Sequence, residues 1–305
     1  MSSQRVIIGN SLHVLKTMEA DSIDLCITSP PYWGLRDYGS APEIYGGDSS
    51  CEHCWEEHRT PARGGGPCKT TTVGANKDTE GNNRGHPTIT WYCSKCGAWK
   101  GQLGLEPQPQ EYIEHLCAIF DEVKRVLKPT GTCWVNLGDT YGTDKSLAQI
   151  PSRFAIAMTE RGWLLRNEVI WQKPNAMPSS VSDRFTVDHE KLYFFTKGPQ
   201  YYFQQVKEVA KGTDGRNKRT VWAIPTSAST EDHCAMFPQA LIDAPIQACL
   251  PEGGVLIDPF CGSGTTLAYC RAHNLDGIGI EVNPMYKEII ERRSLAKIPQ
   301  LEAYQ

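Results

Sequence analysis

Short β-branched runs alternate with helical segments along most of this chain, and this alternation limits the fold more than any other feature. Seven runs of four to seven residues are rich in aliphatic and aromatic residues, at 4–8, 23–28, 132–136, 165–171, 191–197, 255–258 and 276–281. The segments between them read as helices, at 11–21, 111–131, 151–161, 238–250, 267–274 and from 284 onward. In 111–131 apolar residues recur at three- and four-residue steps, and Pro129 and Gly131 are expected to stop that helix. This β–α–β alternation predicts an α/β fold with a doubly wound, mostly parallel seven-stranded sheet.

Residues 40–105 interrupt this alternation. The segment is rich in Gly, Thr, Asn, charged residues and Cys, and it is poor in aliphatic residues. A structureless stretch of this length is uncommon inside a compact domain. We therefore expect a small Cys-rich lobe at 40–105, inserted into a main domain that comprises 1–39 and 106–305.

The composition is that of a globular protein, and the N-terminal sequence predicts a cytosolic one. Hydrophobic residues make up 40% of the chain and charged residues 22%, which is enough for a core. No apolar run reaches the length of about 18 residues typical of a membrane span, and the N-terminus has no signal-peptide pattern. In a cytosolic chain the 12 cysteines are expected to be thiols or metal ligands instead of disulfides. The net charge of −4 argues weakly against a nucleic-acid partner, but the distribution of charge matters more than its sum.

A glycine loop near the C-terminus has the features of a ligand-binding turn. The strand expected at 255–258 ends in Asp258-Pro-Phe-Cys-Gly262-Ser-Gly264-Thr-Thr, and a helix follows. Two glycines allow a tight turn and a close approach of ligand to backbone, and the helix N-terminus offers free N–H groups. Glu281 ends the next strand, where an acid can accept hydrogen bonds from a ribose diol. A plain strand–helix turn with a surface glutamate is the alternative.

The segment Thr28-Ser29-Pro30-Pro31-Tyr32 directly follows the second expected strand. Loops at the carboxyl ends of strands line the site in a doubly wound sheet. Two prolines fix the backbone, so that a hydroxyl, a carbonyl and an aromatic ring hold definite positions. These groups suit hydrogen bonding to, and stacking on, an extruded nucleobase. A proline turn beside a core tyrosine is the alternative.

Together these segments resemble the amino-methyltransferases that act on DNA. The loop after Asp258 is similar to motif I of that family, which holds S-adenosylmethionine, and S-P-P-Y is similar to motif IV, the catalytic motif. Motif IV precedes motif I here, which is the order of the β class. The resemblance covers nearly the whole chain outside 40–105.

The resemblance also implies residues that bind the cofactor. Asn10 stands where an Asp is common in the family, and His233 with Phe237 and Pro238 is similar to motif X. The implied cofactor-binding set is Asn10, Thr28, His233, Phe237, Pro238, Asp258, Pro259, Phe260, Gly262, Gly264, Thr265, Thr266 and Glu281.

For the reaction, the resemblance implies that Ser29, Pro30, Pro31 and Tyr32 are catalytic. Ser29 and the Pro30 carbonyl would accept hydrogens of the target amine, and Tyr32 would stack on the flipped base. Ser in the first position of this motif goes mostly with N4 of cytosine, and Asp with N6 of adenine. Alternatives are an N6-adenine enzyme of the same fold, an RNA or protein amine as substrate, and a non-catalytic zinc-ribbon protein that binds nucleic acid.

Two C-x-x-C pairs within 40–105 predict a structural Zn²⁺ site. Cys51 and Cys54 form the first pair, and Cys93 and Cys96, followed by glycine, form the second. Four thiolates suit tetrahedral zinc, and a polar lobe with little core needs such support. Possible substitutes among the ligands are Cys68, His53, His58 and His86. A set of free thiols is the alternative.

Residues 207–219 carry five basic and two acidic residues, a local excess of +3 in an acidic chain. The candidate contacts with double-stranded DNA are Lys211, Arg216, Asn217, Lys218 and Arg219. The β class places target recognition in the corresponding region, here 200–232. A solvated charged loop is the alternative. The resemblance further implies a prokaryotic or phage protein, a monomer or homodimer, with a cognate restriction endonuclease as a candidate partner.

Overall fold

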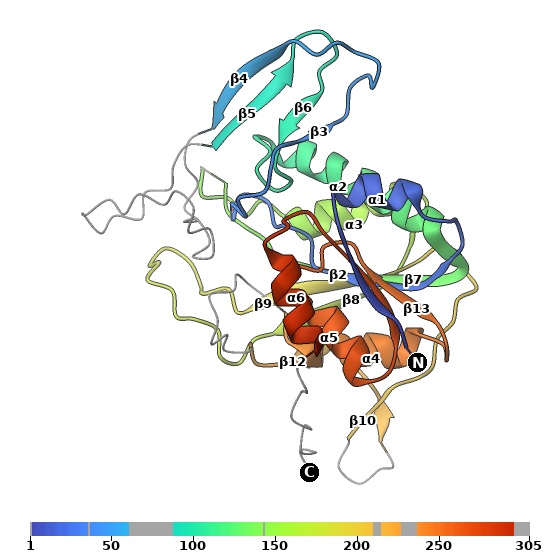
Figure 1. Ribbon diagram of the computed structural model, residues 1–305. Coiled ribbons are helices and arrows are strands. Elements are labelled where there is room, and N and C mark those ends of the chain that lie inside the picture. Colours follow the sequence, from blue (N-terminus) through green and yellow to red (C-terminus); the bar gives the residue numbers. More distant parts are fainter. Residues whose placement is uncertain are drawn as a thin grey trace.

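A computed structural model describes residues 2–35, 37–60, 88–142, 144–209, 215–226 and 237–295 (Figure 1). An eight-stranded sheet forms its centre, in the order β1-β14-β13-β2-β7-β9-β8-β12. Its strands are β1 (Gln4–Ile8), β2 (Ile23–Thr28), β7 (Leu127–Leu137), β8 (Leu164–Gln172), β9 (His189–Thr196), β12 (Val221–Ala223), β13 (Val255–Asp258) and β14 (Asp276–Glu281). All neighbours pair in parallel except β9, which runs antiparallel to β7 and β8.

The sheet therefore confirms the α/β class and the mostly parallel order, and it holds one strand more than predicted. The additional strand, β12, pairs in parallel with the carboxyl end of β8. Three residues inside a polar segment are too few to show a strand period, which is why the sequence did not reveal them. The helix expected at 111–131 ends earlier, at Val126, because β7 already begins at Leu127. Pro129 and Gly131 therefore lie in the strand and do not end the helix.

Within the described residues, six helices cover the two faces of the sheet (Figure 1). One face carries α1 (Ser11–Thr17), α2 (Pro109–Val126) and α3 (Ile150–Glu160). The other carries α4 (Gln239–Cys249), α5 (Thr265–Ala272) and α6 (Tyr286–Leu295). Among the helices of the described ranges, none has the apolar length that a bilayer span requires.

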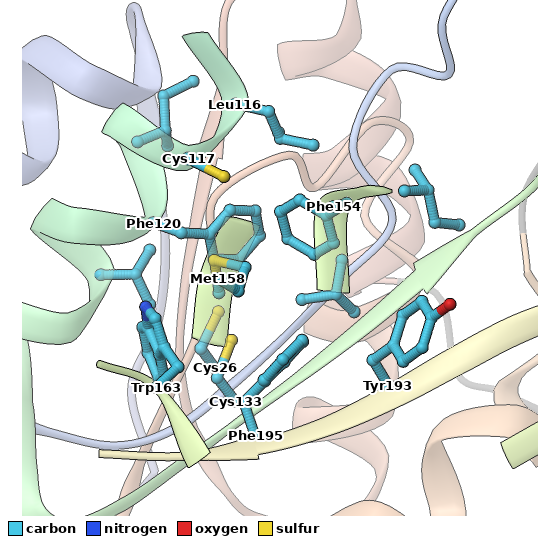
Figure 2. Close-up of a cluster of buried hydrophobic side chains, with 14 of the residues drawn as sticks. Cys26, Leu116, Cys117, Phe120, Cys133, Phe154, Met158, Trp163, Tyr193 and Phe195 are labelled. Atoms are coloured by element: carbon cyan, nitrogen blue, oxygen red, sulfur yellow. The ribbon is translucent and has the colours of Figure 1, made fainter. Parts of the chain in front are cut away.

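Burial on both faces explains the near-continuous apolar strands. Every residue of β2 is buried, and alternate side chains point to opposite faces. Cys26 packs with Phe120 and Phe154 in the cluster beneath α2 and α3 (Figure 2), whereas Leu25 and Ile27 join the cluster beneath α4 and α5. The two hydrophobic cores thus fix the register of the strands that carry the candidate site.

The segment between β2 and α2 forms a separate four-stranded antiparallel sheet at one end of the molecule (Figure 1). Its strands, in the order β3-β6-β5-β4, are β3 (Glu43–Tyr45), β4 (Trp55–Thr60), β5 (Thr88–Cys93) and β6 (Trp99–Gly101). Tyr45 and Trp99 stack on His115 of α2, with ring centroids 4.9 and 5.2 Å away. His115 also lies 3.1 Å from the buried carboxylate of Glu106. This aromatic contact holds the small sheet against the main domain.

Candidate active site

A hydrogen bond joins the two motifs that the sequence singled out. The Thr28 hydroxyl donates to Oδ1 of Asp258 at 2.5 Å, although 230 residues separate them. The Thr266 hydroxyl donates to Oδ2 at 2.6 Å, and the Phe260 amide donates to Oδ1 at 3.1 Å. Burial raises the pKa of Asp258 to about 6, against the opposing effect of these hydrogen bonds. Because β2 and β13 are adjacent and parallel, S-P-P-Y and the glycine loop share the carboxyl edge of the sheet.

The glycine loop is built around Glu281. Its carboxylate accepts hydrogen bonds from the Gly262 amide at 2.9 Å and from the Asn283 amide at 2.8 Å. Burial raises the pKa of Glu281 to about 7. Gly262 and Gly264 both have positive φ angles, 51° and 83°. A Cβ at Gly262 would meet nothing within 4 Å, so the loop faces open space at that position.

Asn10 lies beside this loop and caps α1. Its side-chain oxygen accepts from the amides of Leu12 and His13 at 2.9 and 3.3 Å. The neighbouring Ser11 hydroxyl donates to the Pro259 carbonyl at 2.5 Å, which ties the first helix to the glycine loop. The cap therefore gives a local structural reason for Asn at this position.

The remaining predicted cofactor residues of the described ranges lie in or next to the same region. Thr265 and Thr266 begin α5 after Gly264, and both are buried. Pro238 stands at the N-terminus of α4, and Phe237 before it packs against the core beneath that helix. His233 lies outside the described residues.

The S-P-P-Y segment is held by side chains from three other elements. The Ser29 hydroxyl donates to the Tyr32 hydroxyl at 3.0 Å, and the Tyr32 hydroxyl donates to Oε2 of Glu190 at 2.7 Å. The Pro31 carbonyl accepts from the Tyr112 hydroxyl of α2 at 2.7 Å. Pro30 is buried.

Two further polar residues complete this group, and the sequence did not reveal them. Asn136 of β7 donates to the Tyr32 hydroxyl at 2.7 Å and to Oε2 of Glu190 at 2.6 Å. Lys173, just after β8, forms an ion pair with Oε1 of Glu190. Glu190 directly precedes the strand predicted at 191–197, and a charged residue at a strand end can mark a site. However, only the antiparallel direction of β9 shows that this end of the strand reaches the carboxyl edge of its neighbours.

A second cluster of polar side chains lies in the small sheet. Ligand atoms of Cys51, His53, Cys93 and Cys96 all lie within 4.8 Å of one another. The Sγ atoms of Cys51 and Cys93 are 3.9 Å apart, and Sγ of Cys96 is 3.4 Å from Nδ1 of His53. Tetrahedral zinc, with bonds of about 2.3 Å to sulfur and about 2.0 Å to nitrogen, gives nearly these separations.

Cys54, expected as the fourth ligand, is not in this cluster. Its backbone pairs with the second C-x-x-C segment, because its amide donates to Sγ of Cys93 at 3.3 Å and its carbonyl accepts from the Ser94 amide at 2.9 Å. The Cys54 residue is exposed, and His53, one of the alternative ligands that the sequence left open, lies in the cluster instead. The alternatives Cys68 and His86 lie outside the described residues.

The basic segment forms a short ribbon of β10 (Lys207–Glu208) and β11 (Arg216–Asn217). It lies on the opposite side of the molecule from the small sheet (Figure 1). Since β9 runs antiparallel, it delivers the chain to the amino ends of its neighbours, so the ribbon and S-P-P-Y do not meet. Arg216 and Arg219 both pair with Glu208, at 2.7 and 3.0 Å. Nζ of Lys218 lies over the Trp222 ring, and Nζ of Lys207 donates a hydrogen bond to the Asn217 side chain. Lys211 lies outside the described residues.

Comparison with known sequences decides the family. The sequence pattern of the N6/N4 DNA methylases matches residues 23–292, which include both S-P-P-Y and the glycine loop. The chain belongs to the N6/N4 DNA methylase family.

Relatives of this DNA methylase align over nearly its whole length. Type II methyltransferase M.SmaI of Serratia marcescens is 30% identical over 97% of this chain and 92% of the relative. M.Cfr9I of Citrobacter freundii is 32% identical over 93% and 85%, and M.XycI of Xanthomonas campestris pv. cyanopsidis is 33% identical over 91% and 83%.

Solved structures share the fold of this DNA methylase. PvuII DNA methyltransferase (cytosine-N4-specific) superposes with a TM-score of 0.67 at 19% identity, over 97% of this chain and 88% of that one. A Thermus thermophilus protein in complex with S-adenosyl-L-methionine gives 0.59 at 17% identity, over 98% and 96%. The family and fold together support a DNA methyltransferase that uses S-adenosylmethionine.

Proposed function

We propose that this DNA methyltransferase transfers a methyl group from S-adenosylmethionine to the N4 amine of cytosine in double-stranded DNA. The observation that carries the proposal is Ser29 in the first position of S-P-P-Y, joined through Thr28 and Asp258 to the glycine loop. PvuII DNA methyltransferase, a structural neighbour that is specific for cytosine N4, supports the same base. The type II relatives support a role in site-specific modification of DNA, with a cognate restriction endonuclease as partner. We propose the cytoplasm as the location of the protein.

The carboxyl edge of the sheet fits the cofactor. Glu281 would bind the ribose hydroxyls, and the backbone at Gly262 and Gly264 would lie along the rest of the molecule, where the open space at Gly262 leaves room. Asp258 holds the loop in place by accepting three hydrogen bonds, from Thr28, Thr266 and the Phe260 amide. When bound, S-adenosylmethionine supplies an electrophilic methyl group.

The target amine would be met by Ser29 and the Pro30 carbonyl. Because the Ser29 hydrogen is directed to Tyr32, its oxygen is left as an acceptor for an amine hydrogen. Accepting these hydrogens pulls the nitrogen toward tetrahedral geometry, which frees its lone pair for attack. Positioning then supplies much of the rate gain. A base inside a duplex is out of reach, so we propose that it is flipped out and stacks on Tyr32.

The test is to incubate the purified protein with unmethylated genomic DNA and S-adenosylmethionine and to identify the modified nucleosides by mass spectrometry. N4-methylcytosine, lost in Ser29→Ala but kept in Ser2→Ala, is the expected result. If N6-methyladenine forms instead, the target base is adenine, while the proposed fold and methyl-transfer chemistry stand. No modified base together with no cofactor binding would favour a non-catalytic nucleic-acid-binding protein.

We further propose that residues 40–105 form a lobe held by structural Zn²⁺, separate from the catalytic domain of 1–39 and 106–305. Cys51, His53, Cys93 and Cys96 fit the ion in donor type and separation. Gly97 follows the second pair with a φ of 73°, and its amide donates to the Cys93 carbonyl, which closes the turn around the proposed ligands. Few of the lobe's described side chains are fully buried, so a metal would supply much of its stability.

For DNA contact, we propose the basic residues of 200–232 as phosphate contacts. Their local charge excess supports this role. Glu208 neutralises part of that charge, since it holds both Arg216 and Arg219.

A further inference from the structure

Glu190 lies at the centre of the polar group around S-P-P-Y, and the function proposed above gives it no role. Its Oε2 accepts from the Tyr32 hydroxyl at 2.7 Å and from Nδ2 of Asn136 at 2.6 Å, and its Oε1 pairs with Lys173. Only 16% of its side chain is exposed. Burying a carboxylate costs free energy of desolvation, so a carboxylate this buried needs compensating partners or a function for its charge.

The hydrogen bonds around Tyr32 all run in one direction. A tyrosine hydroxyl has one hydrogen to donate and two lone pairs to accept with. Tyr32 accepts from Ser29 at 3.0 Å and from Asn136 at 2.7 Å, and it donates to Glu190. The orientation of the Asn136 amide is fixed as well, because the carboxylate and the hydroxyl oxygen both need a donor there. Ser29, Tyr32 and Glu190 therefore form a directed chain that ends on a carboxylate.

We propose that Glu190 is the proton acceptor of the methylation reaction, reached from the target amine through the hydroxyls of Ser29 and Tyr32. This inference rests on the proposed function, but it holds for either exocyclic amine. Glu190 does not touch the target amine. It positions Tyr32 through their hydrogen bond and receives the proton through Tyr32 and Ser29.

The proton and electron balance is complete within this chain of groups. The amine nitrogen forms its new bond to the methyl carbon with its lone pair, and the electron pair of the breaking C–S bond stays on sulfur. The nitrogen, now positively charged, gives a proton to the Ser29 oxygen. Ser29 passes its own proton to Tyr32, and Tyr32 passes its own to Glu190, which becomes a neutral carboxylic acid. Exchange with water then returns the carboxylate.

The surroundings explain why Tyr32 relays the proton as a neutral phenol and does not serve as a phenolate base. Burial and the neighbouring Glu190 charge raise the pKa of Tyr32 well above its usual value, so Tyr32 stays neutral and only relays. Lys173 is the cation that faces Glu190, and it also lies over the Trp171 ring with Nζ 4.6 Å from the centroid. Its positive charge offsets the negative charge that this carboxylate brings into a largely buried site.

Single-turnover methylation of unmethylated genomic DNA by excess full-length protein tests the proposal, after mass spectrometry has shown that the wild type forms a methylated base. Glu190→Gln keeps the shape of the side chain and is expected to slow methyl transfer by about 100-fold or more, within the range of general-base catalysis. The affinities for S-adenosylmethionine and DNA should stay within about twofold, because the loss falls on the transition state. Glu168→Gln is the matched control, since Glu168 pairs with Lys191 across the same two strands at 3.2 Å and does not touch Tyr32.

Tyr32→Phe breaks the same chain one step earlier. If the two residues act in series, the double variant Tyr32→Phe/Glu190→Gln will be no slower than the slower single variant. Additive losses, an unchanged rate in Glu190→Gln, or a rate loss matched by weaker cofactor binding would each overturn the relay while leaving the methyltransferase function in place. A wild type that forms no methylated base would instead remove the proposed function, and the relay with it.

Discussion

The hydroxyl of Thr28 lies 2.5 Å from the carboxylate of Asp258, and this bond connects the last residue of β2 to the last residue of β13. It links the segment proposed to hold the base to the loop proposed to hold the cofactor. Two distant parts of the chain are thereby set at a fixed separation, which an in-line methyl transfer requires.

Thr28→Val should therefore weaken the cofactor site. The substitution keeps the shape of the side chain and leaves one Asp258 oxygen with fewer donors, at a cost of about 1 kcal/mol or more. We expect S-adenosylmethionine affinity, measured by calorimetry, to fall by about five- to tenfold. Thr90→Val is the control, because the Thr90 hydroxyl is buried without a hydrogen-bond partner among the described residues. Equal affinities in the two variants would contradict the structural role of Thr28.

Gly138→Ala should disturb Tyr32 directly. A Cβ at Gly138 would lie 2.7 Å from the Tyr32 ring, so the ring must move. We expect a slower methylation rate with cofactor affinity unchanged, measured by single turnover and by calorimetry. Gly198→Ala, where a Cβ meets nothing within 4 Å, should behave as wild type.

The buried Glu281 should make both stability and cofactor binding depend on pH. Burial raises its pKa to about 7 in the folded protein, so the folded state binds this proton more tightly than the unfolded chain does. Its contribution to the free energy of unfolding is then fully present below the ordinary Glu pKa of about 4.3 and is lost as pH rises through about 7. Urea unfolding of the cofactor-free protein should show this decline, and Glu281→Gln should remove the part around pH 7 while the part from Asp258, around pH 6, remains.

Cofactor affinity should change in the opposite direction, because ribose hydroxyls donate best to an ionised carboxylate. Calorimetric affinity for S-adenosylmethionine should rise between about pH 6 and pH 8 in the wild type, around the pKa of about 7, and stay level in Glu281→Gln. A rise of the same size in both proteins would assign the pH dependence to another group.

The proposed zinc site predicts different results for two adjacent residues. His53→Ala should remove bound zinc, measured by elemental mass spectrometry, whereas Cys54→Ser should retain it, since Cys54 is exposed and outside the cluster. If the proposed ion supports the lobe and takes no part in the reaction, His53→Ala should lower thermal stability. Loss of zinc in Cys54→Ser, with retention in His53→Ala, would restore the four-cysteine site.

Glu208 gives a test of DNA contact by the basic ribbon. Glu208→Gln removes the carboxylate that holds Arg216 and Arg219 and frees their charge. If the ribbon contacts phosphates, the plot of log affinity against log salt concentration should steepen by about one to two units. Glu122→Gln, which removes the ion-pair partner of Arg125 on α2, is the control. An unchanged slope would place DNA contact on the loops at the carboxyl edge instead.

The alternation of apolar runs was enough to predict the sheet and six helices, because strands buried on both faces carry a strong signal. The short β12 and the strands of the small sheet carry no such signal and were not predicted. S-P-P-Y, Asp258 and Glu281 were found by their motifs, and the structure gathers them at one edge. Glu190 could not be assigned, because its place depends on the direction of β9, which no local pattern encodes.

The small sheet enters and leaves the main domain through two strands that pair with each other, since β3 and β6 are antiparallel and Glu43 lies opposite Gly101. Its two connections therefore lie side by side, and the distance between them does not depend on what the segment between them contains. The segment beyond β3 and β6 can therefore be exchanged or lengthened while the ends that it joins stay in place. The two strands themselves are a fixed base, since Tyr45 of β3 and Trp99 of β6 stack on His115 of α2, so a methylase of this design can vary the module only beyond them.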